Sequence, residues 1–269
     1  MRRLLRNFAP TARFLAQTEV HVYAFAIAAN ILLSFFPFLV LILSICRHLL
    51  RWPQSVDVVY QALGDFLPAD AQLLDFVRRN LRFAVASRGR VELFSVALLL
   101  FSANGVFEPL EVALNRVWGF RNRSYWRNQW LSFGLIFACG SLALISTLLT
   151  ATNRRLLASL DGPLPALARW AGLVAMKMFA LPVSILILFL VYWVLPNGPV
   201  PRRRALVAAI LAGLAVEAVK YLYFLVWPWL DLRGAYGPFF ISVTLVFWGF
   251  LSSLVVLAGA QLTARRIPE

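Results

Sequence analysis

The stretch LFSVALLLFSANGVFEPLEVALNRVW, residues 93–118, starts as an apolar run and ends with four polar side chains at regular spacing. These are Asn104, Glu108, Glu111 and Asn115. At about 100° per residue, their spacing puts all four on one face of a helix. Because a charged side chain inside a bilayer costs about 3 kcal/mol on insertion scales, this polar stripe is expected to face protein or water. It is therefore the first candidate for a functional site.

The composition is typical of a membrane protein. Of the 269 residues, 61% are hydrophobic and 14% are charged, whereas soluble domains carry about 25% charged residues. The net charge of +14 would indicate nucleic acid in a soluble protein. Here the arginines form short clusters between apolar runs, and no basic-aromatic platform accompanies them. Anionic lipid headgroups are therefore the expected partners, and nucleic acid is not.

The apolar runs predict an all-α integral membrane protein with six transmembrane helices in one compact bundle. Each run has about 20 or more residues, enough to cross a bilayer core of about 30 Å. The expected spans are 22–46, 91–114, 130–151, 171–195, 205–227 and 238–262. Short amphipathic helices are expected at the N-terminus and between the first two spans. Residues 1–20 form a basic interfacial segment, and 21–269 form one membrane domain that includes an extracytoplasmic helical segment, 47–90.

The loop arginines predict the orientation of the bundle. One side collects the N-terminus, the loops after the second and fourth spans, and the C-terminus. Their arginines are Arg2, Arg3, Arg6, Arg13, Arg116, Arg121, Arg123, Arg127, Arg202, Arg203, Arg204, Arg265 and Arg266. The 47–90 segment is also rich in arginine, which weakens the contrast, although nearby aspartates balance part of its charge. Both termini are therefore expected in the cytoplasm.

Further polar residues within the spans extend the candidate site. Asn30 and Ser34 share one face of the first span, and Glu217 and Lys220 lie three apart in the fifth. At about 1.5 Å per residue, Glu108 and Glu217 are expected at similar depth. Two interpretations stay open. The set lines a polar cavity for a substrate or proton, or it holds helices together through hydrogen bonds and an internal acid–base pair.

Four segments of the chain resemble the YihY/BrkB family of bacterial inner-membrane proteins. They are YAFAIAANILLSFFPFLVLILSI, FSANGVFEPLEVALNRVWG, VYWVLPNGPVPRRRALVAAILAGLAVEAVKYLYFLV and GAYGPFFISVTLVFWGFLSSLVVLAGAQL. The resemblance covers nearly the whole chain in order, and it implies six spans in the bacterial inner (cytoplasmic) membrane. One departure is Gln261, where the family often has glutamate. Members have been described as ribonucleases, serum-resistance factors and transporters or exporters.

Two functions fit these observations. The first is a transporter or exporter of a lipid-like or anionic amphiphilic substrate, and the second is a non-transporting scaffold in envelope assembly or resistance. An enzyme is not expected, because no nucleophile–base pair or known hydrolase motif is apparent. The two histidines, His21 and His48, lie at opposite ends of the first span. Neither a metal nor another cofactor is therefore predicted. The oligomeric state stays open, a homo-oligomer included.

Overall fold

The computed structural model of the chain is helical throughout the residues that it describes, which are 2–44, 90–159, 181–226, 229–230 and 232–264. The helices are α1 (Arg2–Leu15), α2 (Thr18–Ser44), α5 (Arg90–Trp118), α6 (Tyr125–Ser159), α8 (Arg202–Val226), α9 (Leu232–Tyr236) and α10 (Phe240–Ala264). A further apolar helix covers Leu181–Val194, and a 3-10 turn over Gly237–Phe239 leads into α10. The expected segment 47–90, apart from Arg90, lies outside the described residues, as does the first part of the expected fourth span.

Three helices within the described residues are long and apolar enough to cross a membrane. The qualifying stretches are Thr18–Phe35, Arg202–Tyr223 and Phe240–Ala264. They overlap the expected first, fifth and sixth spans, and each extends beyond the expected span at one end. The all-helical class is therefore confirmed for the described residues, whereas the six-span bundle stays a prediction.

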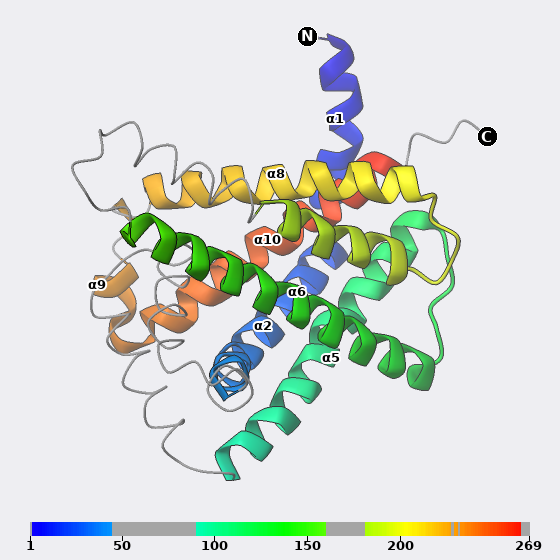
Figure 1. Cartoon of the computed structure of the whole chain (residues 1–269). Helices are drawn as coiled ribbons and strands as arrows, with labels where there is room; N and C mark the ends of the chain where they lie inside the picture. The colour runs from blue at the N-terminus through cyan, green and yellow to red at the C-terminus, as the bar shows by residue number, and fades with distance from the viewer. Residues whose placement is uncertain (1, 45–89, 160–180, 227–228, 231, 265–269) are drawn as a thin grey trace.

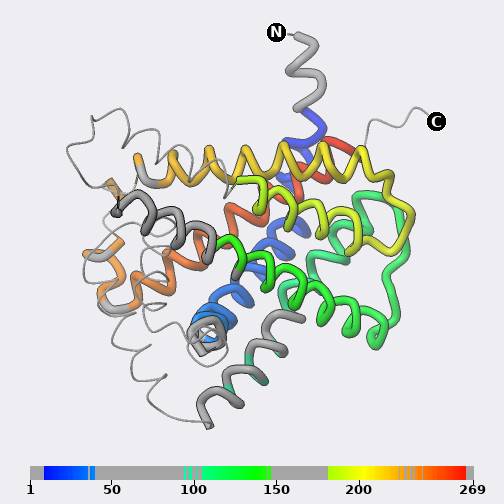
Figure 2. Tube along the Cα trace, in the orientation of Figure 1, coloured from blue at the N-terminus to red at the C-terminus, as the bar shows by residue number. Residues whose placement is uncertain are grey.

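Helix α2 lies at the centre of the packing, between α5 and α10, while α8 packs on α10 and α6 on α5. Figure 1 shows α8 along one side of the molecule and α1 projecting from the same side. The trace in Figure 2 follows the same path. Two small residues allow α2 to approach its neighbours. A Cβ at Gly249 would lie 3.1 Å from the Ala28 Cα, and a Cβ at Gly105 would overlap the Asn30 side-chain amide.

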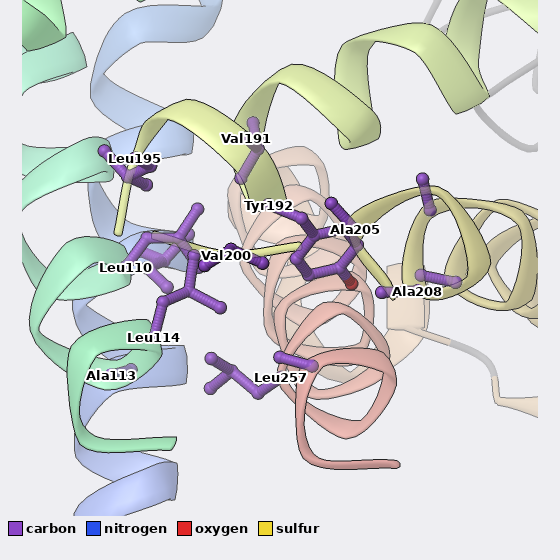
Figure 3. Close-up of a cluster of buried hydrophobic side chains, with 14 of the residues drawn as sticks. Leu110, Ala113, Leu114, Val191, Tyr192, Leu195, Val200, Ala205, Ala208 and Leu257 are labelled. Carbon is purple, nitrogen blue, oxygen red and sulfur yellow. The ribbon is translucent and has the colours of Figure 1, made fainter. Parts of the chain in front are cut away.

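A cluster of buried apolar side chains joins helices that lie far apart in the sequence, and Figure 3 shows part of it. Leu110 and Leu114 come from α5, Tyr192 from the 181–194 helix, Ala208 from α8 and Leu257 from α10. The phenol of Tyr192 is fully buried, and it donates a hydrogen bond of 2.6 Å to the Val256 carbonyl. This bond pairs the one polar atom of the ring inside an otherwise apolar cluster.

Helix α5 ends where its sequence provides a glycine. Gly119 follows Trp118 and has φ = +73°, a left-handed conformation that glycine adopts without steric cost. The Phe120 N–H then turns back and donates to the Asn115 carbonyl at 2.8 Å. This is the hydrogen-bond pattern of a glycine-terminated helix. It sends residues 119–124 back toward the end of the 181–194 helix.

The turn after the 181–194 helix fits against this returning segment at Gly198. A Cβ at Gly198 would lie 2.6 to 2.7 Å from three atoms of the Phe120 ring. We therefore expect Gly198→Ala to lower the free energy of unfolding by about 1–3 kcal/mol, because a rigid ring must move aside. Denaturant titration in mixed micelles measures the change.

Gly134→Ala is the matched control for this substitution. Gly134 lies in α6, and a Cβ added there would meet nothing within 4 Å. Alanine should therefore leave stability unchanged or raise it slightly through helix propensity. Adding Phe120→Ala to Gly198→Ala should recover part of the loss due to the clash. Equal stability of Gly198→Ala and the unmodified protein would contradict the steric explanation.

Candidate functional site

The structure divides the polar stripe of α5 into an exposed part and a buried part. Glu108 is exposed, while Glu111 and Asn115 are almost fully inaccessible, at 2% and 0% exposure. Asn104 lies in the same helix, but its side chain is not among those that the structure describes. The predicted stripe therefore contains two environments, one of which is closed off by other parts of the chain.

The buried part belongs to a network that we call the Glu111–Arg123 cluster, made of Glu111, Asn115, Asn122, Arg123 and Asn197. The Asn115 side-chain amide donates to Glu111 Oε1 at 3.2 Å and to Asn122 Oδ1 at 3.1 Å. The backbone N–H of Asn197 donates to Asn115 Oδ1 at 2.7 Å. Asn115 thus links the end of α5 to both of the segments that pack against it.

Arg123 supplies the positive charge of the cluster. Its Nη1 lies 3.4 Å from Glu111 Oε1, and its backbone N–H donates to the same oxygen at 3.3 Å. The Arg123 side chain is 17% exposed and that of Glu111 is 2% exposed. A buried carboxylate needs such a partner, because its desolvation otherwise costs several kcal/mol.

The guanidinium of Arg123 also caps the helix that ends at Val194. It donates to the carbonyl of Pro196 at 2.9 Å and to that of Val194 at 3.4 Å, and it contacts the Leu195 carbonyl as well. The last carbonyls of a helix have no partner inside the helix. The planar fork of arginine reaches several of them at once, which the single ammonium of lysine cannot do.

The two loops are joined a second time at the edge of the cluster. The side-chain amide of Asn197 donates to the Arg121 carbonyl at 2.8 Å. Together with Arg123, this bond ties the connection between α5 and α6 to the connection that leads into α8. Both loops are on the same side in the predicted topology, and the contact agrees with that arrangement.

The other predicted site residues form separate local contacts. Asn30 donates to the Ala26 carbonyl at 2.9 Å and Ser34 to the Ile31 carbonyl at 3.1 Å, both within α2. Asn30 nevertheless lies against α5 at Gly105. Pro109 cannot donate to the Gly105 carbonyl, so the α5 backbone is one hydrogen bond short where Asn30 meets it.

Glu217 and Lys220 pair with each other on α8. Lys220 Nζ lies 2.6 Å from Glu217 Oε1, and the lysine side chain is 12% exposed. This is the internal acid–base pair that was one of the two interpretations left open by the sequence. The two residues lie one turn apart on α8, so this contact is local to one helix.

Sequence reasoning missed Asn122, Arg123 and Asn197 as members of the site. All three lie in loops, where helical periodicity carries no information. The signal that was present is chemical, because a carboxylate buried in a helix needs a cation, and Arg123 lies only 12 residues after Glu111, in the loop that follows α5. Across the described part of the chain, no group of three or more His, Cys, Asp or Glu side chains is placed to hold a metal ion.

The described residues form helices, three of which are long and apolar enough to cross a membrane, and this is the architecture of a helical membrane protein. The family model described as virulence factor BrkB matches residues 11–267, and the chain belongs to that family. It is similar to the UPF0761 membrane protein YihY of Escherichia coli (strain K12 / DH10B), with 26% identity over 226 residues that cover 78% of this chain and 70% of that protein. The YihY protein of Shigella boydii serotype 18 shows the same identity and coverage. No solved structure matches the chain.

Proposed function

We propose that the protein is a transporter or exporter of a lipid-like or anionic amphiphilic substrate, and that it is not an enzyme. In this proposal six spans cross the bacterial inner membrane, with both termini in the cytoplasm. Anionic lipids are the proposed partners of the protein, and nucleic acid is not. The proposal is compatible with a homo-oligomer. The loop arginines and the family support the location and orientation.

The observation that supports transport is the position of Glu108. Its side chain is exposed on α5, one turn before the buried Glu111. A carboxylate left exposed to lipid would cost about 3 kcal/mol on insertion scales, so an aqueous or polar path beside α5 is the favourable surrounding. The Glu111–Arg123 cluster then closes one end of the protein next to this path.

A liposome assay tests the proposal. Purified protein is reconstituted with a fluorescent anionic phospholipid, and movement between leaflets is measured by dithionite quenching. We expect transport by the unmodified protein and at least a tenfold lower rate for Glu108→Gln, because glutamine keeps the shape of the side chain but removes its charge. Glu19→Gln is the control, since Glu19 is exposed at the start of α2 and pairs with Arg116.

Two results would count against this function. If the unmodified protein moves no lipid, flipping of that substrate class is excluded. If Glu108→Gln transports normally, Glu108 is not in the path. The alternative is a scaffold in envelope assembly or resistance. The observation that favours it is the extensive pairing within the Glu111–Arg123 cluster, which is suited to holding two loops in a fixed position.

A further inference from the structure

The two halves of helix α5 lie in different surroundings. The second half is enclosed, with Leu114 at 0% exposure, and the Glu111–Arg123 cluster fixes its end. In the first half, Phe94 and Phe101 are 67% and 73% exposed. The second half is therefore anchored by several segments, whereas the described segments leave these two positions of the first half uncovered.

The backbone of α5 is weakened at the boundary between the two halves. Pro109 lies inside the helix, and because proline has no N–H, the carbonyl of Gly105 lacks its α-helical donor. Gly105 adds backbone freedom at the same place, since it has no Cβ. Proline in a helix interior is a common cause of a sharp bend. A change in the direction of α5 is therefore expected to be concentrated between these two residues.

Helix α2 brings a side-chain amide against this weak point. A Cβ at Gly105 would lie 2.0 Å from Asn30 Oδ1 and 2.8 Å from Asn30 Nδ2. In the structure, Nδ2 donates to the carbonyl of Ala26 at 2.9 Å. That carbonyl also accepts the backbone N–H of Asn30, because α2 is a continuous helix there. The Ala26 carbonyl thus has two donors, whereas the Gly105 carbonyl has lost its α-helical one.

We propose that α5 is a hinged helix with two states, which differ in the acceptor of the Asn30 side-chain amide. In the state of this structure, the amide donates to the Ala26 carbonyl. In the second state, α5 bends between Gly105 and Pro109, and the same amide donates to the Gly105 carbonyl. The exchange breaks one hydrogen bond and forms another, while Ala26 keeps its backbone donor. Neither state then has a net loss of hydrogen bonds, which is the property of a two-state element.

The hinge supplies the moving part of the transporter proposed above, and this consequence rests on that function. Glu108 is exposed and lies between Gly105 and Pro109 in the sequence. A bend there changes the surroundings of its carboxylate, while the Glu111–Arg123 cluster holds the following turns in place. The hinge therefore controls access to Glu108. The bend itself does not depend on transport.

Distances between spin labels test the hinge in the full-length protein. Nitroxides are attached at Phe94→Cys in the first half of α5 and at Arg121→Cys beyond its anchored end, both exposed positions. The native cysteines, Cys46 and Cys139, are replaced by alanine. The protein is reconstituted into liposomes that contain phosphatidylglycerol, and double electron–electron resonance measures the separation of the labels. We expect two distance populations when α5 and α2 are otherwise unmodified.

Two variants should reduce the population of the bent state. Pro109→Ala returns the α-helical donor to the Gly105 carbonyl, and it should reduce this population at least about fivefold, the effect of one ordinary hydrogen bond. Asn30→Leu removes a sole donor from the bent state but only an additional donor at Ala26 from the other state. It should reduce the population at least about twofold. Replacing a proline inside a helix by alanine favours the helix, so Pro109→Ala is expected to fold, and thermal unfolding checks this.

Pro37→Ala and Ser34→Ala are the matched controls. The first removes the proline of α2, and the second removes a side-chain hydrogen bond within α2, so both should keep the two populations. A single distance population without these substitutions would overturn the hinge. An undiminished second population in Pro109→Ala would overturn the site of the bend, and the same result in Asn30→Leu would remove that residue as the switch.

The distance measurement separates the hinge from the proposed transport function. Normal lipid flipping by a protein with one distance population would overturn the hinge alone. Two populations that respond to Pro109→Ala, in a protein that flips no lipid, would overturn only the transport proposal.

Discussion

Replacing Arg123 by methionine is expected to lower the free energy of unfolding by about 3–5 kcal/mol. The substitution leaves Glu111 buried without its cation, and loss of one partner of a buried ion pair has about this cost. It also removes the donors that reach the carbonyls of Val194 and Pro196 at the end of a helix. Denaturant titration in mixed micelles, followed by tryptophan fluorescence, measures the change.

Three further variants separate the charge of Arg123 from its shape. Arg123→Lys keeps the charge near Glu111 but loses the fork, so it should recover only part of the stability. Arg123→Met combined with Glu111→Gln should lose less than Arg123→Met alone, because no unpaired charge stays buried. Arg121→Met is the control and should change stability by less than about 0.5 kcal/mol, since that side chain is exposed. A loss below about 1 kcal/mol in Arg123→Met would show that the ion pair is not a structural element.

Periodicity in the sequence was enough to locate the long helices among the residues that the structure describes. The apolar run before Glu108 and the polar spacing after it predicted one continuous helix, and α5 covers Arg90–Trp118 as a single element. The start of the last span is also locally encoded, because Gly237 has φ = +51° and Pro238 lies in the 3-10 turn that leads into α10. These are local features, which adjacent residues determine by themselves.

The composition of the site could be predicted only in part, because its contacts are not local. The bond from Asn197 to Asn115 joins residues 82 positions apart, and that from Arg123 to Pro196 joins residues 73 apart. No periodic pattern encodes such pairs. The spacing of polar residues identified Glu111 and Asn115 as members of one helical face. The same spacing placed Glu108 on that face as an equal candidate. Helical spacing cannot show which turn of a helix is covered by other segments.

Replacing Asn115 by alanine should have the second largest effect, with a loss of about 2–4 kcal/mol. Asn115 is fully buried, and its amide makes hydrogen bonds to Glu111, to Asn122 and from the backbone of Asn197. Alanine leaves these groups without their partner, and an unsatisfied buried polar group costs about 1–3 kcal/mol. Asn122→Ala is the control within the same cluster. Asn122 is exposed, so water can replace its bond and the loss should stay below about 1 kcal/mol.

A double-mutant cycle shows whether Asn115 and Arg123 act as one unit. Both side chains donate to Glu111 Oε1, so removing either one already weakens the environment that the other stabilises. The double variant Asn115→Ala/Arg123→Met should therefore lose at least about 1 kcal/mol less than the sum of the two single losses. The same titration measures all three variants. Losses that add within about 0.5 kcal/mol would mean that the two loops are held independently, and the Glu111–Arg123 cluster would then be two separate contacts and not one network.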